Sequence, residues 1–190
     1  KALLEKQGGI VQDQHFKNLL LNILPNITEQ EIQDLHLALI LDQGIQNESN
    51  TLKYHPYFKL SSFNDDLINS VASTGLKILQ GSKHVIPTDK LAVKINEALN
   101  IKLDTRTIEN ILRVVKECKF TDGGIGLFSW RHIHPRTLRD KINYIFTREK
   151  KALHFQKIAT LITDSKFDSK RVNVQAVHNE LIRNSQFILI

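Results

Sequence analysis

The sequence has no methionine, one cysteine (Cys118), four prolines and one tryptophan among its 190 residues. A single cysteine cannot form a disulfide within the chain, so we expect a reducing, cytoplasmic location, nucleoid-associated if the protein is bacterial. No run approaches the ~18 apolar residues that a membrane-spanning helix needs, and no N-terminal segment has the layout of a secretory signal. Because the chain begins with Lys1 and lacks methionine, we expect a fragment, or a chain with a modified residue, more than a complete gene product.

Patterns that would carry catalysis or bind a metal are also missing. His132 and His134 could offer two imidazoles, but no cysteine or carboxylate cluster lies near them at zinc spacing. The glycine-rich segment 122–126 precedes an apolar, strand-like run, whereas a phosphate-binding loop precedes a helix. No nucleophile motif with a histidine or acid partner stands out. The sequence therefore predicts no enzymatic activity, no cofactor and no metal site.

The composition that remains is that of an ordinary globular protein, with 41% apolar and 24% charged residues and room for one to three domains. Residues 54–66 mix proline, serine and asparagine before a new apolar periodicity begins. A second boundary precedes Pro135, which suits the first turn of a helix. These breaks predict three units, which are residues 1–60, 61–131 and 132–190.

A repeated order of elements links the three units. Residues 172–190 read as a helix running into a strand, and residues 108–112 align with 177–181 at an offset of 69. A weaker copy contains 16–24 and 28–31. Three short helices closed by a β-hairpin form the winged version of the helix-turn-helix. We therefore predict a mainly α fold (α+β with small β-wings) that is a tandem array of three winged helix-turn-helix units.

Helix and hairpin limits follow from apolar spacing and from capping residues. In the second unit, Asp-Gly-Gly between apolar flanks predicts a hairpin over 120–128. In the third unit, Asn173 is the expected N-cap of the last helix. The helices are expected at about 67–80, 88–100 and 105–119 in the second unit, and at about 135–148, 154–163 and 174–183 in the third, which also has a short strand at 151–154 and a wing strand at 187–190.

The three units differ more in their charge than in their order of helices and strands. Residues 131–190 carry twelve Lys/Arg and five Asp/Glu, whereas residues 1–60 carry five and seven. A local basic excess creates a field that attracts polyanions and is typical of a nucleic-acid-binding module. The alternative is a solvated surface that has no partner.

Four segments of the third unit match the pattern of a known family, namely residues 135–138, 152–155 with 158–159, 174–181 and 187–190. On these segments the third unit resembles the HARE-HTH family, the winged-helix domain of the delta subunit of bacterial RNA polymerase, of some sigma-factor-like proteins, of restriction-associated modules and of animal chromatin regulators. It implies transcription or DNA-directed work, although the delta subunit acts through polymerase. In that family the wing continues with a glycine-containing turn and a second strand, so we expect truncation or disorder past Ile190. The first two units look like generic winged helices.

The expected binding residues lie on and around the third helix of the third unit. Asn and Gln can pair with adenine and Arg with guanine, while other basic groups hold phosphates. An equally weighted alternative is that Asn173 only caps the helix and Gln175 is merely exposed. We expect Val174, Val177, Leu181 and Ile182 in the core. The base-reading candidates are Arg171, Asn173, Gln175, His178, Asn179 and Arg183, and the phosphate candidates are Arg136, Arg139, Lys141, Lys150, Lys151, Lys157, Lys166 and Lys170.

The equivalent helices of the other units are weaker candidates. The second unit offers Lys102, Arg106, Thr107, Asn110 and Arg113, but two glutamates on the same helix reduce its positive charge. The first unit has an acidic helix that would repel phosphate, so we expect it to pack against a protein or its neighbours. The predicted function is a non-enzymatic, transcription-associated module that binds double-stranded DNA through the third unit. The alternative is an adaptor that binds RNA polymerase or another transcription or chromatin protein without contacting DNA.

Overall fold

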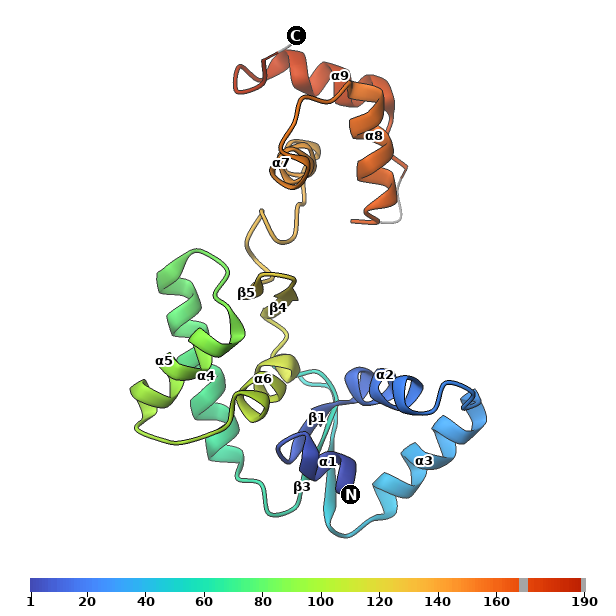
Figure 1. Cartoon of the computed structure of the whole chain (residues 1–190), viewed down its shortest axis with the longest axis vertical. Coiled ribbons are helices and arrows are strands. Elements are labelled where there is room, and N and C mark those ends of the chain that lie inside the picture. The colour runs from blue at the N-terminus through green and yellow to red at the C-terminus, as the bar shows by residue number, and fades with distance from the viewer. Residues whose placement is uncertain (168–170, 189–190) are drawn as a thin grey trace. The chain divides into compact units, whose positions relative to one another are not determined.

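The chain divides into two compact units, Lys1–Leu127 (the N-terminal unit) and Phe128–Ile190 (the C-terminal unit) (Figure 1). The computed structural model describes residues 1–167 and 171–188. It is mainly helical with two small antiparallel sheets, as the sequence predicts. Residues 1–60 and 61–127, which the sequence separates, lie in one compact unit, and the second unit begins at Phe128 instead of 132.

The first half of the N-terminal unit folds around a three-stranded antiparallel sheet of order β1-β3-β2. Strand β3 is central, and Phe58 on it is fully buried against Phe16. The third helix begins at a capping box, in which Thr28 and Glu31 bond each other's backbone N–H. The elements are α1 (Ala2–Lys6), β1 (Ile10–Gln12), α2 (Asp13–Ile23), α3 (Glu29–Leu41), β2 (Ile45–Glu48) and β3 (Tyr57–Leu60).

The second half of the N-terminal unit has three helices followed by a hairpin, as the sequence predicts. The Asp-Gly turn connects two strands that pair from Cys118↔Leu127 to Thr121↔Gly124. Ile86, in the link between the first two helices, forms an antiparallel bridge with Ile125. The elements are α4 (Asp65–Ser82), α5 (Thr88–Leu99), α6 (Thr105–Val114), β4 (Cys118–Thr121) and β5 (Gly124–Leu127).

Helix α6 ends at Val114, although the sequence predicted helix as far as Lys119. Val115 is extended, with φ −78° and ψ 119°, and it forms a bridge with Tyr54. A β-branched residue with a strand-like partner favours that conformation over another helical turn. Cys118 then opens β4, where burial raises the pKa of its thiol to about 12.

The C-terminal unit consists of α7 (Leu138–Glu149), α8 (Phe155–Asp164) and α9 (Val174–Arg183) around an apolar core. Helix α7 starts after Thr137, which forms a capping box with Asp140, so the predicted start at Pro135 is too early. The core residues are Ile142, Ile145, Ile158, Ala159, Ile162, Val177 and Leu181.

The two strands predicted for the C-terminal unit are not seen in the part that the structure describes. Residues 151–154 form no strand, although His154 is extended, and residues 187–188 are not in a strand. The rest of the predicted wing strand, 189–190, lies outside the described residues. Over residues 1–167 and 171–188, no helix is long and apolar enough to cross a membrane.

Candidate nucleic-acid interface

Helix α9 holds the predicted base-reading residues, and its position follows from one buried stripe. Val177 is fully buried and Leu181 is 5% exposed, and both contact the core of the C-terminal unit. Asn173 caps the helix as predicted, because its side chain accepts the N–H of Gln175 at 2.8 Å. With one stripe buried, residues on the opposite side of α9 face solvent.

Gln175, Asn179 and Arg183 share that outer side of α9. They are spaced four residues apart, and all three side chains are exposed. The Gln175 amide donates to the Asn179 carbonyl oxygen at 3.1 Å, so the two amides are held side by side. The stripe therefore presents two amides followed by a guanidinium, the groups that pair with adenine and guanine edges.

Several other residues of α9 lie differently from the prediction. Val174 is 40% exposed and Ile182 is 57% exposed, so neither belongs to the core. Only the 177/181 stripe is covered, because α9 contacts α7 and α8 with one side. His178 is half-buried, and its ring lies 4.7 Å from that of Phe155, which makes it a packing residue.

The basic residues predicted to hold phosphates are spread over the C-terminal unit. Arg136 precedes α7 and Lys150 follows it, so the 12-residue helix separates them by ~18 Å. Lys151 and Lys157 are exposed on the α7–α8 link and on α8, and Arg171 is exposed before α9. Lys166 is exposed after α8. Lys170 lies outside the described residues.

Two of the phosphate candidates are engaged within the fold. Lys141 is 7% exposed, so burial removes it from the surface that the sequence assigned to it. The Arg139 Nε lies 3.5 Å from the Glu180 carboxylate on α9. The sequence reasoning missed Glu180, because no local spacing links residues that are so far apart in the chain.

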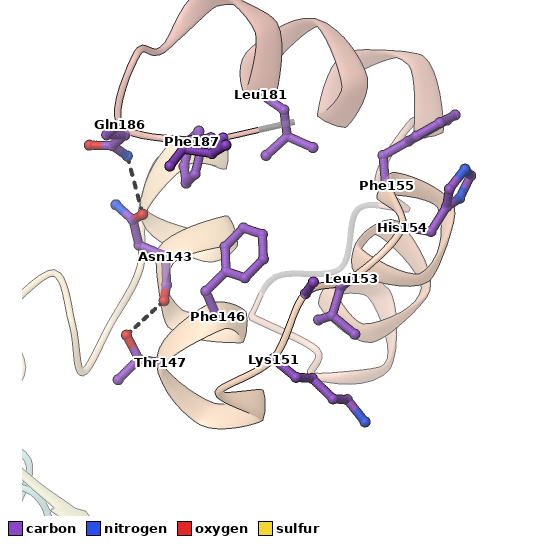
Figure 2. Close-up of a pocket in the computed structure, with 12 residues that line it drawn as sticks. Asn143, Phe146, Thr147, Lys151, Leu153, His154, Phe155, Leu181, Gln186 and Phe187 are labelled. Carbon is purple, nitrogen blue, oxygen red and sulfur yellow. Dashed lines mark hydrogen bonds between the residues drawn. The ribbon is translucent and has the colours of Figure 1, made fainter. Parts of the chain in front are cut away.

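An open pocket of about 740 Å³ lies beside the α7–α8 link (Figure 2). Phe146, Leu153 and Phe187 give it apolar walls, and Lys151 stands at its edge. The Gln186 amide donates to Asn143 at 3.2 Å on the opposite rim. The pocket adjoins the 151–154 segment that lacks a strand partner, and it contains no cluster of titratable groups that would suggest catalysis.

The histidines 132 and 134 contact aromatic rings. The His134 ring stacks on Phe128 at 4.1 Å, and the His132 ring stacks on Trp130 at 5.3 Å. Among the residues that the structure describes, no group of three or more His, Cys, Asp or Glu side chains could hold a metal ion.

The third helix of the N-terminal unit's second half, α6, is covered by the first half. Thr107 and Asn110 are 4% and 2% exposed, and α6 contacts β1. The Asn110 amide donates to the backbone oxygen of Gln7 at 2.7 Å, and Arg106 donates to that of Lys6 at 3.1 Å. These residues, which the sequence offered as weaker DNA contacts, join the two halves of the unit.

The Asn110 contact gives a stability prediction. Asn110→Ala is expected to lower the free energy of unfolding of the N-terminal unit by about 1–3 kcal/mol, because the backbone oxygen of half-buried Gln7 loses its donor. Urea denaturation followed by circular dichroism measures this change. The exposed Asn22, replaced in the same way, should change it by less than about 0.5 kcal/mol. Equal effects of the two substitutions would contradict the joining role of Asn110.

Comparison of the chain with protein-family models, with curated proteins and with solved structures finds no match.

Proposed function

We propose that the C-terminal unit is a duplex-DNA-binding module and that α9 enters the major groove. The observation that carries the proposal is the exposed stripe Gln175, Asn179 and Arg183 on a helix of a strongly basic unit. The N-terminal part of such a helix lies nearest the base edges in a helix-turn-helix. Gln175 is the second residue of α9, and Asn179 lies one turn further along the same side. The activity is binding, with a role in transcription, and requires no cofactor.

We also propose that the chain contains three winged-helix units in tandem, the last of them of the HARE-HTH type. Residues 1–60 have the order helix, strand, two helices and two strands, in a sheet where β3 lies between β1 and β2. In residues 65–127 the bridge of Ile86 to Ile125 takes the place of the first strand pair. Helices α7, α8 and α9 repeat the helical part of this order. The recurrence supports the proposal because a winged helix has this order of elements.

Phosphate contacts in this proposal come from exposed basic residues outside the stripe and from Arg183 at its C-terminal end, which lies farthest from the base-reading amides. Arg171 precedes the Asn173 cap, which places it at the N-terminal end of α9. Helix N-termini and nearby guanidinium groups are common phosphate contacts. Arg136 and Lys157 add positive field from other elements, and this steers the polyanion even where a side chain does not touch it.

Binding of a short mixed-sequence duplex, measured by fluorescence anisotropy over a range of salt concentrations, tests this function. Replacing Arg171 and Arg183 together by glutamine is expected to reduce the slope of log affinity against log salt by about 1.8, or ~0.9 per lost phosphate contact. Where Arg183 instead reads a base, the slope falls by about half as much and sequence preference relaxes. Asn179→Ala should cost about 1–3 kcal/mol on the preferred sequence alone.

The matched control replaces Lys90 and Lys94 by glutamine. Both are exposed on α5 at helical spacing, and the double substitution removes the same charge from the N-terminal unit. Equal slopes for the two double variants would show a non-specific charge effect. Absence of duplex binding by the intact chain at low salt overturns the proposal and favours the adaptor, in which the same basic residues meet an acidic surface of RNA polymerase or another transcription or chromatin protein.

A further inference from the structure

Helix α3 exposes more apolar surface than its place in the fold explains. None of its 13 residues is buried, and the exposed fractions of Leu35, Leu37, Ile40 and Leu41 run from 39% to 72%. The half-buried side of the helix contacts the sheet through His36, whose ring lies 5.0 Å from that of Phe58. Exposed aliphatic side chains that gather on one element are typical of a protein-binding surface.

The turn that joins α2 to α3 (Figure 1) lines a hollow that adds to this surface. The hollow has a volume of about 620 Å³, and its apolar lining includes Ile23, Leu24 and Leu35, with exposed fractions of 57%, 48% and 39%. A hollow of this size accepts one or two large apolar side chains of a partner. We call the hollow together with the exposed leucines of α3 the α2–α3 surface.

Two carboxylates line the same hollow. Glu31 and Asp34 both lie on its rim, one turn apart on α3. The backbone N–H and the hydroxyl of Thr28 donate to Glu31 and hold the pKa of its carboxyl below the ordinary value, so it carries a fixed negative charge. Asp34 accepts only an amide from Gln30 among the hydrogen bonds of the described residues, and no basic side chain in that part of the chain forms an ion pair with either carboxylate.

We propose that the α2–α3 surface binds an amphipathic helix of a partner protein, with leucine-like side chains in the hollow and lysine or arginine beside Glu31 and Asp34. The apolar lining selects an apolar face, and the carboxylates select the flanking charge, which together describe a basic amphipathic helix. A second copy fits poorly in this position, because two α2–α3 surfaces face to face would oppose carboxylate to carboxylate. Nucleic acid is repelled for the same reason.

This binding does not depend on DNA binding by the C-terminal unit. The α2–α3 surface is acidic and the proposed DNA-binding surface on α9 is basic, and the two lie on different helices. One proposal can therefore be wrong while the other is right. Substitutions in α9 should leave peptide binding unchanged, and substitutions in α3 should leave duplex binding unchanged.

The test uses the full chain and a fluorescent helical peptide of ~18 residues, about five turns, built from leucine and lysine at helical spacing. A scrambled peptide of the same composition spreads the leucines around the helix, and a third peptide carries glutamate in place of lysine. We expect the amphipathic basic peptide to bind best and its affinity to fall as salt is raised. Equal binding of the basic and scrambled peptides, or of the basic and glutamate peptides, overturns the proposal.

Substitutions at Asp34 and at Leu35 test whether the peptide binds at the α2–α3 surface. Asp34→Lys reverses an exposed charge without touching the core and should weaken binding about tenfold at low salt. Leu35→Gln should weaken it by a similar factor through the lost apolar contact. Matched controls on α5 are Glu97→Lys and Val93→Gln, which alter exposed residues of the same kinds and should change affinity less than about twofold.

Unchanged affinity in Asp34→Lys contradicts the assignment even if Leu35→Gln perturbs the fold. Sedimentation of the chain without peptide tests whether a second copy of the chain occupies the α2–α3 surface instead. A dimer that dissociates in Leu37→Gln, together with no peptide binding, assigns the surface to a second copy and overturns the proposal.

Discussion

Replacing Gly8 by alanine is expected to lower the free energy of unfolding of the N-terminal unit by about 3–5 kcal/mol. Gly8 has a φ of +81°, in the left-handed region that favours glycine. An added Cβ would lie 2.9 Å from both Cα and Cβ of Thr107 and still closer to its hydroxyl. Thr107 is 4% exposed on α6, so the clash forces apart the two halves that Asn110 and Arg106 hold together.

Two optical signals separate this effect from a general loss of structure. Trp130 is the only tryptophan and belongs to the C-terminal unit, so its fluorescence follows that unit, whereas circular dichroism follows both. We expect Gly8→Ala to shift the urea transition seen by circular dichroism and to leave the tryptophan transition in place. Gly81→Ala is the control, because nothing lies within 4 Å of its added Cβ and the helical site favours alanine by up to about 1 kcal/mol. Equal transitions for the two variants would refute the role of Gly8.

Local signals in the sequence were sufficient for most helices. Helix α9 was predicted at its observed limits, because Asn173 marks its start and the apolar spacing marks its length. The hairpin between β4 and β5 was predicted from Asp-Gly, whose turn chemistry is independent of the rest of the fold. Caps, periodicity and turn residues act within a few positions, and a sequence displays them directly.

What the sequence did not reveal depends on contacts between distant residues. The residues around Leu60 carry no sign that α6 packs on β1. The change in composition there therefore indicates a boundary between units, although both sides lie in one compact unit. The strand at 151–154 needed a partner that the described residues do not supply. The sequence places Ile182 in the core because it shares a helical face with Val177 and Leu181, but whether a stripe is covered depends on how the neighbouring helices approach α9.

The third helix of each of the three proposed units, α3, α6 and α9, has a different environment, and this difference bears directly on function. Helix α6 has six buried residues and joins the halves of its unit. Helix α3 has none and combines apolar side chains with carboxylates. Helix α9 buries two and presents amides and a guanidinium. In the proposed arrangement of three units, the third helices therefore carry surfaces of different chemistry, and we propose DNA binding only for the surface on α9.

Phe58→Ala is expected to cost about 3–5 kcal/mol of the free energy of unfolding of the N-terminal unit. Phe58 is fully buried on the central strand β3, with its ring 5.8 Å from that of Phe16 and 5.0 Å from that of His36. Removing the ring leaves a cavity between β3 and the helices α2 and α3, which carry Phe16 and His36. Urea denaturation measures the loss, and Leu52→Ala, at a fully exposed position, should change it by less than about 0.5 kcal/mol.

The milder Phe58→Leu tests how α3 is held in place. Because no residue of α3 is buried, its contact with the sheet depends on half-buried side chains such as His36 and Leu39. A leucine fills most of the cavity and should cost less than about 1.5 kcal/mol overall, but it cannot reproduce the edge-to-face contact with His36. Amide hydrogen exchange is therefore expected to accelerate in α3 while that of α4 and α6 stays near its original rate. Uniform acceleration across the N-terminal unit would instead show that α3 is held by contacts other than the Phe58 ring.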